Sequence, residues 1–267
     1  MPEFIPPFIF GHRGASAYAP ENSLSAFALA VQQGVEAIEL DVHLTADGYI
    51  VVLHDDTVDA TTNGHGSVAN MTLAQIRQFS VRVRNKAKGN TATLTTPEPI
   101  PLLSEVFDHF AQRLITINVE LKGGKSALAE AVARLIQERG LVEQVLLSSF
   151  DRYALAYLQQ QYPTLRRALL YPNSSLEGMM VGMRNSLGWI TGAHALGCEA
   201  VHPFWRLVNP TVMERAHAME LDVNVWTVDD EATIQRLTAL DVDGIITNDP
   251  ARARAAIATL ATALPNH

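Results

Sequence analysis

The stretch AIELDVHLTADGYIVVLH, residues 37–54, decides the fold. Two apolar runs within it, Ala37–Leu44 and Tyr49–Leu53, have the composition of β-strands, and too few residues separate them to form a helix. A parallel crossover between strands needs about a dozen residues. We therefore expect the second run, with His54 at its end, to return antiparallel beside the first.

The turn of this hairpin predicts which residues lie opposite each other. The pair Asp47-Gly48 favours a two-residue turn. Counting back from that turn places Ala46 opposite Tyr49 and Asp41 opposite His54. The turn chemistry therefore predicts that a histidine lies beside a carboxylate.

The rest of the chain alternates short β-rich runs with helical patterns, which is typical of a parallel sheet or barrel. The other expected strands are Phe8–His12, Ile115–Leu121, Val145–Ser149, Arg166–Leu170, Ala200–His202, Asp222–Thr227 and Gly244–Thr247. The expected helices are Ser23–Gln33, Ser126–Arg139, Arg152–Gln161, Pro210–Met219, Glu231–Leu240 and Ala251–Leu264. Eight parallel strands remain when the return strand is set aside. We predict an α/β fold of the TIM type, a (β/α)8 barrel with an antiparallel hairpin strand after its second strand.

One segment, Asp56–Pro101, breaks the alternation. It contains a short helix candidate that begins at Thr72 and a polar stretch with Arg82, Arg84, Lys86 and Lys88. Because connections this long are usually functional, we interpret about 56–101 as a loop insertion. It leaves from a strand end that carries polar residues, so we expect it to lie over the mouth of the site. The chain has no Pro/Gly/Ser-rich linker, which predicts a single domain over residues 1–267.

Composition excludes several classes of protein. With 267 residues, 48% of them hydrophobic, the chain can bury a sizeable core. The only cysteine, Cys198, cannot form an intramolecular disulfide, and no signal peptide opens the sequence, so we expect a cytoplasmic protein. No apolar run reaches the roughly 20 residues that span a bilayer. A net charge of −8 without a basic block argues against a nucleic-acid partner.

Carboxylates at strand ends suggest a metal site. Glu39 and Asp41 are two residues apart, so in a strand they point to the same side. Glu120 and Lys122 share one face of a later strand. Three carboxylates without cysteine suit one hard divalent cation, Mg²⁺ or Ca²⁺. The residues alone support equally well an ion pair between Glu120 and Lys122 at the barrel rim.

Two histidines suggest acid and base catalysis. His12 and His54 each end a strand beside a charged residue, and such a pair can serve as general base and general acid. Arg13 and Lys122 can bind a phosphate without losing their charge. Trp226 either walls the mouth of the pocket or fills the barrel, and we favour the pocket.

Two other strand ends are weaker candidates. Ser148-Ser149-Phe150 lacks the Gly-x-Ser-x-Gly pattern that surrounds a nucleophilic serine, so we interpret it as a barrel strand end. His202 also ends a strand and could reach the site, but we do not include it.

Taken together, these residues resemble the glycerophosphodiester phosphodiesterase family, and the matching motifs occur in order over nearly the whole chain. The matches in the first half are His12-Arg13-Gly14, Ala19-Pro20-Glu21-Asn22-Ser23, Glu39-Leu40-Asp41-Val42, Asp47-Gly48, His54-Asp55 and Thr61-Thr62-Asn63-Gly64. The later matches are Ile100-Pro101-Leu102-Leu103, Glu120-Leu121-Lys122, Ser148-Ser149-Phe150, Val225-Trp226-Thr227-Val228 and residues 244–250. Each match is weak by itself, whereas the ordered series is specific.

The resemblance implies a barrel related to the phosphatidylinositol-specific phospholipases C that hydrolyses glycerophosphodiesters to sn-glycerol 3-phosphate and an alcohol. It assigns the roles as follows: one divalent cation on Glu39, Asp41 and Glu120, a general acid/base pair in His12 and His54, and phosphate binding by Arg13 and Lys122. The family often has an arginine where this chain has Ala60. We expect that departure to affect the anchoring of the insertion or the choice of head group.

Two alternatives remain open. A lysophospholipase D or sphingomyelinase-D-like enzyme would need an apolar groove, but the insertion is polar apart from scattered Val81, Val83 and Leu94. A non-catalytic barrel that binds phosphorylated ligands should have lost a catalytic group, and none of the expected groups is missing from this sequence.

Overall fold

The computed structural model describes residues 5–82, 97–110, 112–123, 126–172 and 187–263. Within these residues, eight strands form a closed parallel ring, and β3 (Ile50–Val52) pairs antiparallel with β2 outside it. The strands of the ring, in order, are β1 (Phe8–His12), β2 (Ala37–Leu44), β4 (Thr116–Leu121), β5 (Val145–Ser149), β6 (Arg166–Tyr171), β7 (Ala200–Pro203), β8 (Asp222–Val225) and β9 (Gly244–Thr247). Pairing of β9 with β1 closes the ring. The predicted TIM-type barrel with an added return strand is confirmed.

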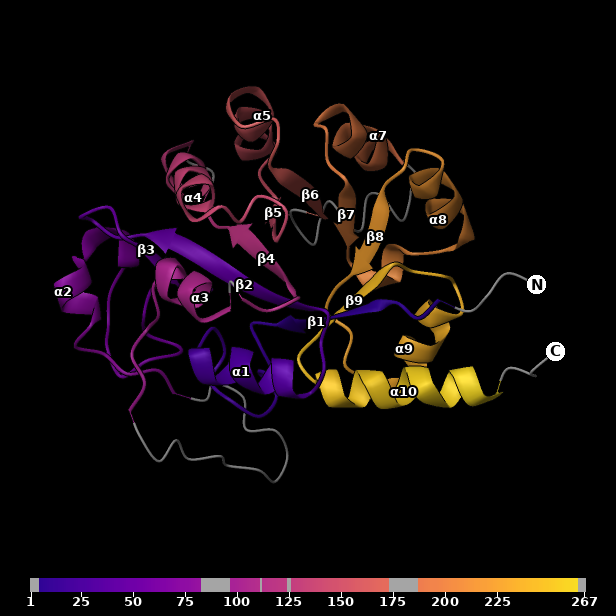
Figure 1. Cartoon of the computed structure of the whole chain (residues 1–267), viewed down its shortest axis with the longest axis horizontal. Helices are drawn as coiled ribbons and strands as arrows, with labels where there is room; N and C mark the ends of the chain where they lie inside the picture. Colours follow the sequence, from indigo (N-terminus) through magenta and orange to yellow (C-terminus); the bar gives the residue numbers. More distant parts are fainter. Residues whose placement is uncertain (1–4, 83–96, 111, 124–125, 173–186, 264–267) are drawn as a thin grey trace.

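The helices lie around the outside of the strands, with α2 beside β3 at one side of the molecule (Figure 1). The described helices are α1 (Leu24–Gln32), α2 (Leu73–Ile76), α3 (Leu103–Phe110), α4 (Ser126–Arg139), α5 (Arg152–Gln161), α7 (Gly188–Ala195), α8 (Pro210–His217), α9 (Glu231–Thr238) and α10 (Pro250–Ala263), with 3-10 turns η1 (Val68–Asn70) and η2 (Trp205–Leu207). None of the helices in the described parts of the chain is both long and apolar enough to cross a membrane.

Capping side chains set where several helices begin. The Ser23 hydroxyl accepts from the amide of Ala26 at the start of α1, and Asn209 caps α8 just before Pro210. Such caps satisfy amides that have no partner within the helix. Two helices were not predicted. α3 buries apolar residues at helical spacing directly after the insertion, and α7 contains two glycines, which weaken its helical pattern.

The hairpin between β2 and β3 forms, but its predicted register is wrong by one residue. Val42 lies opposite Val52, and the amide of Leu53 donates to the carbonyl of Asp41 at 3.0 Å, so Leu53 and not His54 lies opposite Asp41. The cause is a three-residue loop in place of a two-residue turn. The amide of Thr45 donates to the carbonyl of Tyr49 across this loop, and Gly48 has a φ of 85°.

The outer and inner faces of the barrel strands are packed differently. Apolar side chains on the outer face of the strands pack against the helices as one large core, which includes Ile38, Leu40 and Val119. Inside the ring, small groups such as Leu146, Ala168 and Ala200 pack together. β2 and β4 also carry buried polar residues, and the half-buried His12 ends β1. These residues lie towards the carboxyl-terminal face, where TIM barrels hold their active sites.

The described part of the insertion forms its own small hydrophobic cluster. Val58, Val68, Ile76 and Val81 pack there against Val51 and Leu53 of the hairpin. The predicted helix at Thr72 is present as α2, and Thr72 and Gln75 form a reciprocal capping box. Val81 is therefore part of this cluster. Arg84, Lys86, Lys88, Val83 and Leu94 lie outside the described residues, so the position of the insertion over the mouth stays a prediction.

Stability should depend on pH through His202, which is fully buried on β7. Burial lowers its pKa from 6.5 to about 3, so between those values the unfolded chain binds a proton there and the folded protein does not. The free energy of unfolding therefore falls as pH falls through this window, by up to about 1.4 kcal/mol per pH unit.

Urea unfolding at about pH 7.5 and about pH 5.5 measures this dependence. The wild type should lose about 1 kcal/mol more on acidification than a His202→Gln variant, which cannot titrate. Equal losses in the two proteins would show that His202 does not remain neutral in the fold.

Candidate active site

The turn after β1 places the first site residues. Arg13 has a φ of 56° and Gly14 a φ of 84°, so both lie in the left-handed region that favours glycine. The amide of Arg13 donates to Glu39 Oε2 at 2.9 Å, which ties the turn to β2. A Cβ on Gly14 would lie 2.5 Å from the carbonyl carbon of Ala26. Only glycine thus allows the turn to pack on α1 while Arg13 points into the site.

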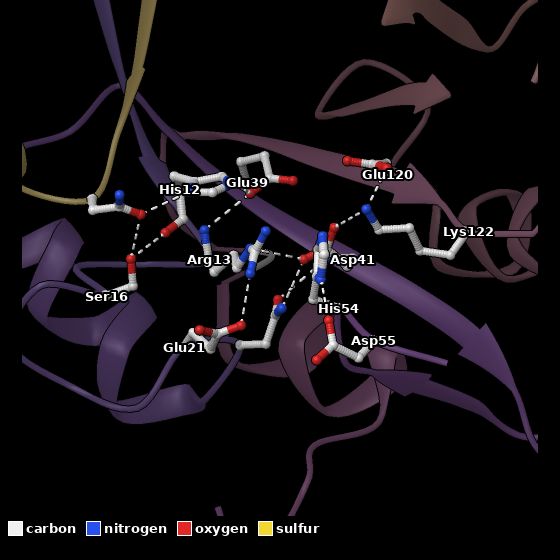
Figure 2. A network of polar contacts seen from close by, with 12 residues as sticks. His12, Arg13, Ser16, Glu21, Glu39, Asp41, His54, Asp55, Glu120 and Lys122 are labelled. Atoms are coloured by element: carbon white, nitrogen blue, oxygen red, sulfur yellow. Dashed lines mark hydrogen bonds and ion pairs between the residues drawn. The ribbon is translucent and has the colours of Figure 1, made fainter. Parts of the chain in front are cut away.

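The three predicted carboxylates meet where β2 pairs with β4. Parallel pairing places Glu120 opposite Asp41, and Glu39 lies on the same strand as Asp41. One oxygen from each carboxylate lies within 4.8 Å of the others, and the three residues are 3%, 1% and 7% exposed in sequence order. Asn22 Nδ2 donates to Asp41 Oδ2 at 2.8 Å and fixes that carboxylate. Figure 2 shows this network.

Two cations lie against the carboxylates. Lys122 Nζ is 3.0 Å from Asp41 Oδ1 and 2.5 Å from Glu120 Oε1, and Arg13 Nε is 3.4 Å from Asp41 Oδ2. Arg13 is also held by Glu21, at 2.7 Å. Glu120 therefore combines both interpretations of the sequence, because it pairs with Lys122 and also belongs to the carboxylate cluster (Figure 2).

The cluster contains more negative charge than these cations balance. Burial and repulsion from Asp41 raise the pKa of Glu39 well above its usual range and raise the pKa of Glu120 to about 7. Burial also favours protonation of Asp41, but Lys122 and Arg13 outweigh burial and hold its pKa well below the usual range. A divalent cation with oxygen ligands would relieve this repulsion, so the three carboxylates fit such an ion.

His12 is held by a chain of side chains from the other end of the sequence. Asn248 Nδ2 donates to Asp229 Oδ2 at 2.7 Å, which turns Asn248 Oδ1 towards His12 Nδ1, also at 2.7 Å. Ser16 Oγ donates to the same oxygen at 2.8 Å. The proton of neutral His12 is therefore on Nδ1, and Nε2 is left to accept. Burial, with a smaller effect of Arg13, lowers the pKa of His12 to about 4.

His54 has a charged partner instead. Its Nδ1 lies 2.6 Å from Asp55 Oδ1, so this histidine also carries its proton on Nδ1 when neutral. Its carbonyl oxygen accepts from His43 Nε2 at 3.1 Å. Burial lowers the pKa of His54, while Asp41 and the hydrogen bond to Asp55 oppose that shift. The two imidazoles thus share a tautomer and differ in the charge of the group that holds them.

A cavity of about 100 Å³ joins these groups. Its wall contains the two histidines, the two cations, two of the carboxylates and two aromatic rings: His12, His54, Arg13, Lys122, Glu39, Glu120, Phe150 and Trp226. Every predicted site residue contributes to its wall except Asp41. The ring of Trp226 packs at 5.6 Å on Phe150, and its Nε1 donates to the carbonyl of His202 at 2.7 Å. His202 itself is not among the described residues that line the cavity.

Besides Asp55, which holds His54, and Ser16, which donates to Asn248, sequence reasoning missed four more residues that support the site. Asn248 and Asp229 hold His12, while Glu21 and Asn22 hold Arg13 and Asp41. Three of them, Glu21, Asn22 and Asn248, fall within the motifs on which the family resemblance was based, although no role was assigned to them. The position of Asn248 in its motif was the available signal, but its partner His12 is 236 residues away in the sequence.

A barrel with buried carboxylates, two strand-end histidines and two cations around one cavity defines the class of metal-assisted phosphoric ester hydrolases. Comparison with known proteins identifies a family within this class. The model of the glycerophosphoryl diester phosphodiesterase family matches residues 12–252, so the chain belongs to that family.

Relatives and solved structures agree with this membership. A glycerophosphodiester phosphodiesterase of Caldanaerobacter subterraneus subsp. tengcongensis is 34% identical over 245 residues, which cover 91% of this chain and 94% of that protein. An Oleispira antarctica phosphodiesterase, solved with its product sn-glycerol-3-phosphate, has a TM-score of 0.80 and 25% identity over 95% of this chain and 97% of its own. A glycerophosphodiester phosphodiesterase from Agrobacterium tumefaciens has a TM-score of 0.76 and 27% identity over 93% and 99%.

Replacing Gly14 by alanine should destabilise the protein, because the new Cβ meets the backbone of Ala26 and φ is positive. We expect a loss of about 2–4 kcal/mol in the free energy of unfolding, together with a loss of activity. Gly48→Ala is the matched control, since Gly48 has a similar φ of 85° and nothing within 4 Å of the added Cβ. Urea unfolding of both variants checks this. Equal losses would mean that the close approach at Gly14 has no energetic consequence.

Proposed function

We propose that this protein hydrolyses glycerophosphodiesters to sn-glycerol 3-phosphate and an alcohol, by metal-assisted acid and base catalysis. The observation that carries the proposal is the cavity at which two imidazoles, buried carboxylates and two cations meet. Family membership and the 34% identity to a named glycerophosphodiester phosphodiesterase support the same substrate class. The substrate is a small molecule, and residues 1–267 act as one domain.

Glu39, Asp41 and Glu120 would hold one divalent cation, Mg²⁺ or Ca²⁺, because all three supply only hard oxygen ligands. Such an ion neutralises charge on a phosphodiester oxygen when it is bound. Arg13 and Lys122 also bind the diester anion, whose single charge is shared by two oxygens. Both residues stay protonated throughout, since neighbouring carboxylates raise their pKa values against the effect of burial.

The different partners of the two histidines support different roles. His12 is held by a neutral amide and its pKa is low, so His12 is the base and its Nε2 takes a proton from the nucleophile. His54 is held by the Asp55 carboxylate, which stabilises the imidazolium, so His54 is the acid. As oxygen attacks phosphorus, the bond from phosphorus to the leaving alcohol breaks, and His54 gives that alcohol its proton. The nucleophile is water, or the neighbouring hydroxyl of the glycerol. In the second case water must then open the cyclic phosphate to give sn-glycerol 3-phosphate.

The rival activity on lysophospholipids requires space for an acyl chain. The site cavity of about 100 Å³ is lined mainly by polar and charged side chains, and Val81 of the insertion is buried in the insertion's own cluster. These observations favour the small diester. Turnover of glycerophosphocholine against lysophosphatidylcholine separates the two activities.

Activity should depend on a divalent cation and on His12. After removal of metal with a chelator, hydrolysis of glycerophosphocholine should stop, and Mg²⁺ or Ca²⁺ should restore it. Glu120→Gln should raise the cation concentration needed for half-maximal activity, because one anionic ligand is lost.

His12→Ala should lower kcat by about 10²- to 10⁴-fold while cation binding persists. A folded, fully active His12→Ala protein, or no rescue by any divalent ion, would contradict the mechanism.

The pH profile should report the role of Asp55. The hydrogen bond that His54 donates to Asp55 raises the pKa of His54, so Asp55→Asn should lower that pKa. An acid must be protonated to act, and the alkaline limb of the kcat profile should therefore move to lower pH in the variant. The measurement is kcat against pH for both proteins with saturating cation. A shift of the acidic limb alone would instead make His54 the base.

A further inference from the structure

Two buried polar atoms on the inner wall of the barrel have no use in the mechanism above. Asn118 on β4 is 1% exposed and Ser148 on β5 is 0% exposed. Neither Asn118 Oδ1 nor Ser148 Oγ has a hydrogen-bond partner among the described residues. Buried polar atoms in proteins are nearly always hydrogen-bonded, so two orphans in one place call for an explanation.

Both residues lie next to the candidate metal ligands and line the same cavity. Strand pairing puts Asn118 opposite Glu39 and Ser148 opposite Glu120. The cavity of about 100 Å³ that contains His12 and His54 also has Asn118 and Ser148 in its wall. The side chains that carry the unpartnered atoms therefore belong to the wall of the cavity that also contains the proposed acid and base.

The neighbouring serine shows that an orphan hydroxyl is not a general property of this strand end. Ser149 is also buried, at 1% exposed. Its Oγ donates to the carbonyl of Leu121 at 3.1 Å and accepts from the amide of Asp151 at 3.0 Å. Ser149 is thus used by the fold, whereas Ser148 is not.

The chemistry of the two orphans matches an alcohol. An amide oxygen accepts a hydrogen bond and a serine hydroxyl both donates and accepts, so neither attracts an anion by charge. A free alcohol group can donate to Asn118 and exchange hydrogen bonds with Ser148. Arg13 and Lys122, on the same cavity, provide the charge that a phosphate needs.

The size of the site cavity also suits a glycerol group. A cavity of about 100 Å³ is small, which suits a short polyol. A second cavity, of about 530 Å³, adjoins it and shares Glu120, Lys122, Phe150 and Leu170 with it. The other ester group of a diester can extend there. The small cavity is therefore the place for the glycerol moiety, which all glycerophosphodiesters share.

We propose that Asn118 and Ser148 form a subsite that binds the free hydroxyl groups of the glycerol moiety and so selects glycerophosphodiesters over other phosphodiesters. This rests on the function proposed above. A diester without those hydroxyls leaves both buried atoms unpaired, which is how a polar site rejects an analogue that lacks a hydrogen-bonding group.

The test compares Ser148→Ala with Ser149→Ala on two substrates, with saturating divalent cation. Glycerophosphocholine carries glycerol hydroxyls and bis(p-nitrophenyl) phosphate carries none. Ser148→Ala should lower kcat/KM about 10- to 100-fold on glycerophosphocholine and less than about 2-fold on the other substrate. Ser149 lines the larger cavity, but its Oγ is already bonded to Leu121 and Asp151. Ser149→Ala should therefore lower the unfolding midpoint in urea and leave the ratio of the two kcat/KM values unchanged. Asn118→Ala should change that ratio in the same direction as Ser148→Ala.

Binding measurements separate the subsite from the reaction. Calorimetry on the cation-loaded protein should show weaker binding of sn-glycerol 3-phosphate to Ser148→Ala, about 10-fold, with binding of inorganic phosphate unchanged. Equal losses for both ligands, or for both substrates, would overturn the subsite. So would a raised cation requirement in Ser148→Ala, because Ser148 would then act through the metal site. If the wild type hydrolyses neither substrate, the proposed function fails, and the calorimetry still decides the subsite.

Discussion

The buried carboxylate of Asp41 is the group on which the rest of the site depends. It is 1% exposed, and burial of an unpaired charge costs several kcal/mol in a protein interior. Lys122, Arg13 and Asn22 each approach its oxygens. Those three residues come from the end of β4, the turn after β1 and the loop before α1. Satisfying one carboxylate therefore brings together segments that surround the mouth of the barrel.

The need to compensate the buried charge of Asp41 explains why the site contains both positive and negative side chains. Glu39 and Glu120 add to the negative charge around Asp41, and burial makes that repulsion strong. The two cations offset only part of it, so the cluster favours a divalent ion. With such an ion present, the balance shifts towards positive charge, which suits a phosphodiester anion. Asn118 and Ser148, which line the same cavity level with Glu39 and Glu120, are neutral, and this agrees with the proposed subsite for an alcohol.

Most of the ring could be predicted because each strand is a short apolar run between turn signals, and the hairpin followed from a connection too short for a crossover. Its register could not be predicted, because Asp47-Gly48 is compatible with a turn of two residues or a loop of three, and the positive φ of Gly48 occurs in both. α3 carried the helical spacing of buried residues in its sequence and was missed because it directly follows the insertion. In the site, the carboxylates and histidines were visible as charged residues at the ends of apolar runs.

The sequence by itself determined the barrel, the identity of the charged residues and the strand ends that carry them, because hydrophobic periodicity and turn chemistry are local properties. Only the tertiary structure decided which atoms face each other. Asn248 orients His12 across 236 residues, and this contact exists because β9 closes the ring against β1. The unpartnered oxygens of Asn118 and Ser148 likewise became recognisable only once the ring was closed. Whether a polar atom is satisfied depends on every strand around it, and no local stretch of sequence contains that information.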